Sequence, residues 1–77
     1  MENIIQQINQ KYEGEINHIQ KVGKVEISIT LNRDVNTADF AQKLQDDLVK
    51  IIDELTIVKI NIVDADGNLC DTFSSNQ

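Results

Sequence analysis

Two changes of hydrophobic period between Val25 and Val63 constrain the fold of this chain more than any other feature. Apolar and polar residues alternate over Val25–Asn32, which is typical of a strand with one buried face. Spacings of three and four then predict a helix over Thr37–Leu55, and alternation returns over Val58–Ile62. A strand, a helix and a strand with short connections form a βαβ unit with parallel strands and a right-handed crossover. The apolar residues that carry these patterns are Val25, Ile27, Ile29, Leu31, Phe40, Ala41, Leu44, Leu48, Ile51, Ile52, Leu55, Val58, Ile60 and Ile62.

The residues before this unit predict a helix and a hairpin partner for the first strand. A stripe of isoleucines indicates a short helix over Glu2–Tyr12, ended by Gly14. A strand over Glu15–Gln20 has a weaker pattern, because Ile16 and Ile19 cannot both face the core in a regular strand. Val22-Gly23 would form the turn into the next strand.

The residues after the unit predict a second hairpin. Asp66-Gly67 between apolar alternations is a strong turn signal, with Gly67 at positive φ and Leu69–Phe73 as the return strand. The predicted fold is a single α+β domain over residues 1–77, with element order α-β-β-α-β-β. It is a two-layer sandwich with one open sheet face, and we expect the polar tail Ser74–Gln77 to fray.

Size, charge and cysteine content exclude several classes of protein. The 77 residues include one cysteine, which excludes an internal disulfide, and the net charge is −6. An acidic surface repels nucleic-acid phosphates, so we expect no direct nucleic-acid binding. No signal peptide or membrane-spanning run is present, which predicts a cytoplasmic protein with no membrane association.

The long helix carries start signals and charge pairs. Asn36 or Thr37 would cap its N-terminus. On its polar face Asp39 with Lys43, and Asp46 with Lys50, have the i, i+4 spacing of weak ion pairs.

Three groups of residues could carry chemistry, and each also has a structural interpretation. Asp64, Asp66 and Asn68 resemble part of a calcium loop, but Ile62 and Phe73 would occupy ligand positions, so we interpret the segment as a hairpin turn. We predict no metal site and no cofactor.

The single histidine and the single cysteine do not suggest catalysis. His18 has no serine or cysteine partner at a recognisable spacing, so we predict a surface or strand-edge position. Cys70 is interpreted as a small buried residue, because its acidic neighbours disfavour a thiolate. No catalytic motif is present, and we predict that the protein is not an enzyme.

The open sheet face supports the leading functional hypothesis. Alternation places one set of polar residues opposite the helix, and these are the candidate partner-binding residues: Glu26, Ser28, Thr30, Lys59 and Asn61. They suggest a small regulator, adaptor or inhibitor that binds a protein partner or forms a homodimer through the sheet face or its edge.

An alternative hypothesis uses the acidic patch of the long helix, formed by Asp46, Asp47, Asp53 and Glu54. Such a patch would mimic nucleic-acid phosphates, as in a phage-encoded inhibitor of a host defence protein. A solvated helix face is the simpler interpretation, because Lys43 and Lys50 interrupt the acids.

In its hydrophobic spacing, the segment from Val25 to Ile62 resembles βαβ halves of small bacterial families that include the alkaline-shock protein family. The resemblance includes no polar motif, so it implies no function.

Overall fold

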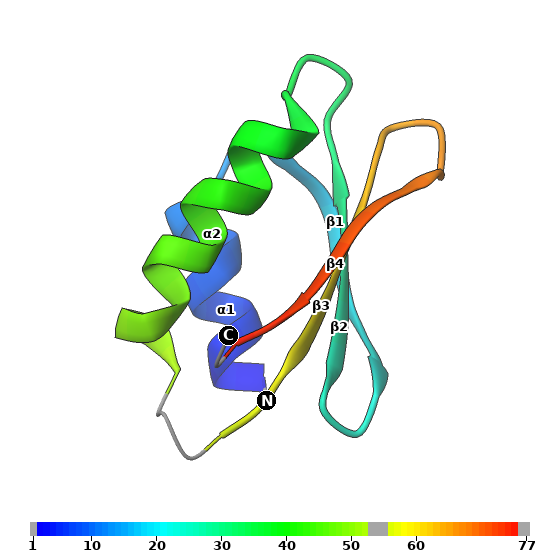
Figure 1. Ribbon diagram of the computed structural model, residues 1–77. Helices are drawn as coiled ribbons and strands as arrows, with labels where there is room; N and C mark the ends of the chain where they lie inside the picture. Colours follow the sequence, from blue (N-terminus) through cyan, green and yellow to red (C-terminus); the bar gives the residue numbers. More distant parts are fainter. Residues whose placement is uncertain (1, 53–55, 76–77) are drawn as a thin grey trace.

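The computed structural model describes residues 2–52 and 56–75, which form two layers. Figure 1 shows both helices on one side of a four-stranded sheet, whose other side is uncovered. The elements in chain order are α1 (Glu2–Lys11), β1 (Ile16–Gly23), β2 (Glu26–Leu31), α2 (Thr37–Ile51), β3 (Lys59–Val63) and β4 (Leu69–Ser74). The predicted α+β fold and its element order are therefore confirmed.

The sheet is mixed and its strands follow the chain in the order β1-β2-β3-β4. The two hairpins β1–β2 and β3–β4 are antiparallel, whereas β2 and β3 are parallel, as the βαβ pattern predicts. In the parallel pair Glu26 lies beside Lys59, and Ser28 lies beside Asn61. The two hairpins thus meet along β2 and β3 at the centre of the sheet.

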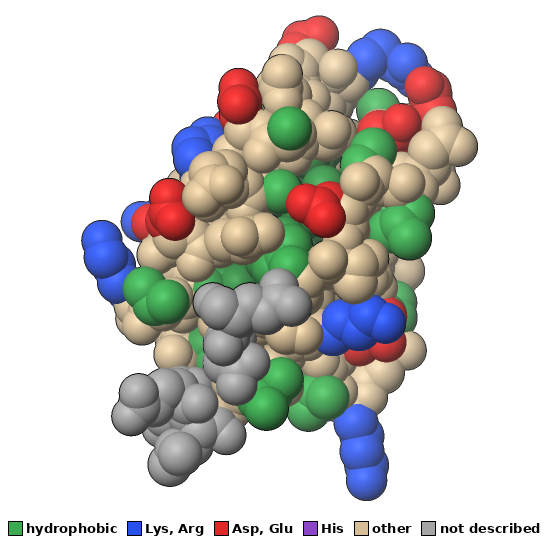
Figure 2. All heavy atoms as spheres, viewed as in Figure 1, with side chains coloured by type: hydrophobic (Ala, Val, Ile, Leu, Met, Phe, Trp, Pro, Cys, Tyr) green, Lys and Arg blue, Asp and Glu red, His purple; other side chains and the backbone are tan. Residues whose placement is uncertain are grey.

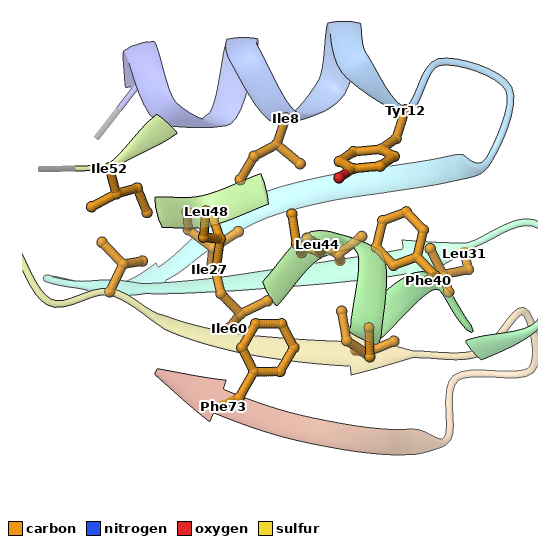
Figure 3. Close-up of a cluster of buried hydrophobic side chains, with 14 residues drawn as sticks. Ile8, Tyr12, Ile27, Leu31, Phe40, Leu44, Leu48, Ile52, Ile60 and Phe73 are labelled. Carbon is orange, nitrogen blue, oxygen red and sulfur yellow. The ribbon is translucent and has the colours of Figure 1, made fainter. Parts of the chain in front are cut away.

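The hydrophobic core lies between the sheet and the helices (Figure 3). The predicted stripe of α2 faces this core: Leu48 is 1% exposed, and Ile52 at the C-cap is 6% exposed. The ring of Tyr12 packs edge-on against Phe40, with 5.0 Å between the centroids. The buried residues are Ile8, Tyr12, Ile27, Ile29, Leu31, Phe40, Ala41, Leu44, Leu48, Ile52, Val58, Ile60, Ile62 and Phe73.

A β-bulge explains how β1 buries two isoleucines that a regular strand could not. The register shifts between Ile16, which lies opposite Leu31, and His18, which lies opposite Thr30. The extra residue shifts by one position the alternation of side chains between the two faces of the strand. Ile16 and Ile19 therefore both pack against the core. The β1–β2 turn also differs from the prediction, because it is formed by Lys24 and Val25 rather than by Val22 and Gly23.

The ends of several elements also differ from the predictions. Val25, expected on the buried face, belongs to the turn and is 53% exposed. Helix α2 ends at Ile51 because Ile52 adopts an extended conformation, and the predicted end at Leu55 lies outside the described residues. Asn36 is the N-cap, and its side chain accepts a 3.0 Å hydrogen bond from the Asp39 N–H.

The C-terminal residues that we expected to fray are bound to the sheet as far as Ser75. Ser74 ends β4, and the Ser75 N–H donates to the Val58 carbonyl at 2.9 Å. The Ser75 hydroxyl accepts from the Val58 N–H and donates to the Thr56 carbonyl. These bonds anchor the chain beside β3, and Asn76 and Gln77 lie outside the described residues.

Candidate functional site

The candidate site is the sheet face opposite the helices, which we call the open face. Ile27, Ile29 and Leu31 of β2 point into the core, so the residues that alternate with them point the other way. Residues paired with them on the neighbouring strands point to the same face, so each of these positions begins a row across all four strands. The open face consists of three rows: Gly23, Glu26, Lys59 and Ser74; Gln20, Ser28, Asn61 and Thr72; His18, Thr30, Val63 and Leu69.

The five candidate residues predicted from the sequence therefore share this face. Sequence reasoning missed the contributions of the edge strands, which include His18, Gln20 and Thr72. Those residues could be assigned to the face only after the strand order and the bulges were known. The alternation of β1 over His18 and Gln20 is the signal that was available.

Polar side chains of the open face are hydrogen-bonded to one another across the strands. Asn61 Nδ2 donates to Glu26 Oε2 at 2.6 Å, and Thr72 Oγ1 donates to Asn61 Oδ1 at 3.1 Å. On β1, His18 Nε2 lies 3.2 Å from Gln20 Oε1. These bonds connect β2, β3 and β4 laterally and hold the surface in one arrangement.

The open face is balanced in charge, although the chain as a whole is acidic. Of its residues, Glu26 carries a negative charge and Lys59 a positive one, and the two are register neighbours. The chain has a net charge of −6. The residues of the open face therefore contribute no net charge, and the other described acidic residues lie on other surfaces.

Exposed apolar side chains occur mainly at the ends of the sheet. Among the described residues, Val22, Val25, Ile57 and Leu69 are exposed large hydrophobics that belong to strands or adjoin them, and Val49 lies on α2. Leu69 belongs to the open face beside Val63. Such residues at the margin of a polar face are the kind of contact that a protein partner would bury.

The alternative acidic patch is divided in the structure. Asp47 is half-buried and accepts a hydrogen bond from the hydroxyl of Tyr12, which follows the end of α1, so it is only partly exposed to solvent. Asp46 is exposed beside Gln42, whereas Asp53 and Glu54 lie outside the described residues. Figure 2 shows acidic and basic side chains interspersed over the visible face of α2.

The contacts of Asp47 and Lys43 attach α2 to the end of α1. Burial, followed by the hydrogen bond to Asp47, raises the pKa of Tyr12 above its usual range. Lys43 Nζ lies 3.0 Å from Glu15 Oε1 and 5.9 Å from the centre of the Tyr12 ring. The ion pairs among the described residues are Lys43–Glu15 and Arg33–Asp66, so the predicted i, i+4 pairs of α2 do not form there.

The loop between β3 and β4 is a hairpin turn, as predicted. Gly67 has φ +90°, and its N–H donates to the Asp64 carbonyl at 3.0 Å. The Asp64 carboxylate accepts from the N–H groups of Asn68 and Asp66, and these bonds, that from Asn68 first, lower the pKa of Asp64. Within residues 2–52 and 56–75, no group of three or more metal-binding side chains occurs.

Calcium at millimolar concentration is therefore expected to leave the melting temperature unchanged. The carboxylate of Asp64 is occupied by backbone N–H groups, and Asp66 pairs with Arg33 at 2.8 Å. Ligand binding to the folded state alone would raise the melting temperature. Thermal melts with calcium and with magnesium as the control would measure this, and a calcium-specific increase that Asp66→Asn removes would contradict the prediction.

The single histidine and the single cysteine are both at the surface. His18 is exposed on the edge strand β1, in agreement with the sequence prediction. Cys70 is exposed, so the prediction that it is a small buried residue is wrong. A register shift between Ile62 and Val63 makes Cys70 an extra residue of β4, and its thiol lies 3.5 Å from the Asn68 carbonyl.

A separate hollow lies where α1 approaches the end of α2, and it is lined by Gln7, Gln10, Lys11 and Ile51. It is shallow and shares no residue with the open face. Among the described helices, none has the length and apolar composition needed to cross a membrane.

Comparisons of the chain with protein-family models, with curated proteins and with solved structures find no match.

Proposed function

We propose that this protein is a non-enzymatic interaction module that binds a protein partner, or a second copy of itself, through the open face. The observation that carries the proposal is the position of both helices on one side of the sheet, which leaves a four-stranded face uncovered. A regulator, an adaptor or an inhibitor would act through such a surface.

The character of the open face supports binding rather than catalysis. The amide of Asn61 bonds to Glu26 and to Thr72, and His18 pairs with Gln20 rather than with a hydroxyl or a thiol. Polar groups that already have partners lose less when a partner protein excludes water from them. This arrangement is suited to a surface that is covered reversibly.

The two edges of the sheet are less suited to binding than its face. Both edge strands contain a register shift: β1 at two places and β4 beside Cys70. Bulges twist an edge away from the geometry that a further strand needs. We therefore place the partner on the face.

The proposal predicts that Ser28→Lys/Thr30→Lys abolishes partner binding, whereas Asp46→Lys does not. Both variants raise the net charge by two, but the first adds its lysines to the central strand of the open face and the second changes the exposed side of α2. The full chain and both variants would be used as bait in a lysate of the source cells, and retained proteins would be identified by mass spectrometry.

The folded state of each variant would first be checked by circular dichroism and thermal melting, because Ser28 and Thr30 are half-buried whereas Asp46 is exposed. A protein retained by the wild type and by Asp46→Lys, but lost with the sheet variant, supports the proposal. The opposite pattern, with binding that weakens steeply in salt, would instead support the acidic decoy.

A further inference from the structure

We infer that the occupant of the open face is a second copy of this chain, packed face to face with strands aligned. This inference rests on the proposed function, because it names the partner of the same surface. The result would be a sandwich of two sheets with the helices of each copy on the outside.

Charge is the first observation that favours a second copy. The open face carries no net charge, whereas the described helices and loops carry an excess of acidic residues, so a basic partner would be attracted to the helices and loops instead. Two copies of an acidic chain repel each other except where their surfaces are neutral. The open face is such a surface, because Glu26 and Lys59 balance each other.

Register is the second observation. Symmetric dimers use the same patch on both subunits, so the patch must be complementary to itself. Because β2 and β3 are parallel and paired in register, a two-fold axis running along the strands between them would place β2 of one copy over β3 of the other. Glu26 of each copy would then face Lys59 of its partner, and strand directions would match.

The same axis pairs the other positions of the central strands. Ser28 would face Asn61, and Thr30 would face the apolar side chain of Val63. The lateral hydrogen bonds of Asn61 to Glu26 and Thr72 remain within each copy. The groups joined by these bonds therefore keep their partners when the face is buried.

Size indicates a reversible dimer. Four strands about 4.8 Å apart, with five residues at about 3.3 Å each, give a face of roughly 19 by 17 Å. Such a face buries less than the roughly 800 Å² per partner of a standard interface. The hydrophobic core is buried within one copy, so we expect the monomer to fold without its partner. We expect a monomer–dimer equilibrium that depends on concentration.

Sedimentation velocity over a concentration series tests this inference. The wild-type chain should approach twice the monomer mass at high concentration. Glu26→Lys leaves two positive charges on the face and Lys59→Glu leaves two negative charges, so each variant alone should dimerise at least roughly tenfold more weakly. An equimolar mixture of the two variants should regain the dimer, because the positive face of one complements the negative face of the other.

Recovery of the dimer in the mixture would show that the charges act between copies. An effect confined to one copy would persist in the mixture, because each variant keeps its own substitution and the neighbours of that substitution. Asp46→Lys on α2 is the control and should dimerise at least as well as the wild type. A wild type that remains monomeric up to about millimolar concentration, a dimer indifferent to both single variants, or a mixture that remains monomeric would each overturn the inference.

Failure of this inference is distinguishable from failure of the proposed function. If the wild type remains monomeric while Ser28→Lys/Thr30→Lys still abolishes capture of another protein, the second copy is excluded and the interaction face stands. If the wild type dimerises but neither the charge variants nor Ser28→Lys/Thr30→Lys alter any association, both proposals fail.

Discussion

Replacing Leu48 by alanine is expected to lower the free energy of unfolding by about 2–5 kcal/mol. The side chain of Leu48 is 1% exposed and belongs to the stripe of α2 that packs over the sheet. Its truncation removes apolar burial and leaves a cavity that the surrounding residues fill only in part. The total free energy of unfolding of a domain of this size is only a few kcal/mol. The variant should therefore be largely unfolded near physiological temperature.

Val49→Ala provides the matched control, because Val49 is the next residue of the same helix and is 68% exposed. Its effect should remain within about 0.5 kcal/mol. Urea unfolding followed by circular dichroism would measure both variants. Equal destabilisation by the two substitutions would show that the two faces of α2 have been assigned incorrectly.

The Tyr12 phenol is expected to resist deprotonation for as long as the chain remains folded. Burial, the hydrogen bond to Asp47 and neighbouring carboxylates raise the pKa of Tyr12 in the folded state. The unfolded chain should titrate near the usual value of about 10. The stabilisation from the protonated phenol is therefore fully present below about pH 10, and is lost as the pH rises from there through the folded-state pKa.

The chain contains one tyrosine, so the near-ultraviolet absorbance of phenolate reports Tyr12 alone. Titrations of the native and the urea-unfolded chain would be compared. Asp47→Asn should move the native titration toward the unfolded one, and Asp46→Asn should move it less because Asp46 acts only through its charge. Native titration near pH 10 without loss of structure would contradict the assigned contact.

The βαβ centre of this fold could be predicted from the sequence because burial on one side of a strand or helix imposes a period. The alternation over β2 and β3 and the stripe of α2 each record one buried face. Turn chemistry was equally informative at Gly67 and at Gly14, which adopts φ +94° after α1. In each case the cause is local, and neighbouring residues in the sequence are sufficient to show it.

Features that depend on distant contacts could not be predicted in this way. The bulge in β1 follows from the need of Ile16 and Ile19 to reach one core, which only the pairing with β2 reveals. Asp46 and Asp47 are adjacent acidic residues, and the local sequence does not show which of them meets a partner. Only the packing of the N-terminal segment brings the Tyr12 hydroxyl to Asp47. The composition of the open face depends in the same way on strand order.

The parallel pairing of β2 with β3 has a consequence for the order of folding events. Each hairpin closes over a short turn, whereas Glu26 and Lys59 must meet across the crossover formed by α2. Contacts distant in sequence are slow to form, because loop closure must precede the stabilisation that they provide. Helix α2 contacts the sheet mainly at β3 and β4, whereas α1 contacts β1. We therefore expect the pairing of β2 with β3, with α2 docked on β3 and β4, to limit the folding rate, and core substitutions in α2 to slow refolding more than substitutions in the β3–β4 turn.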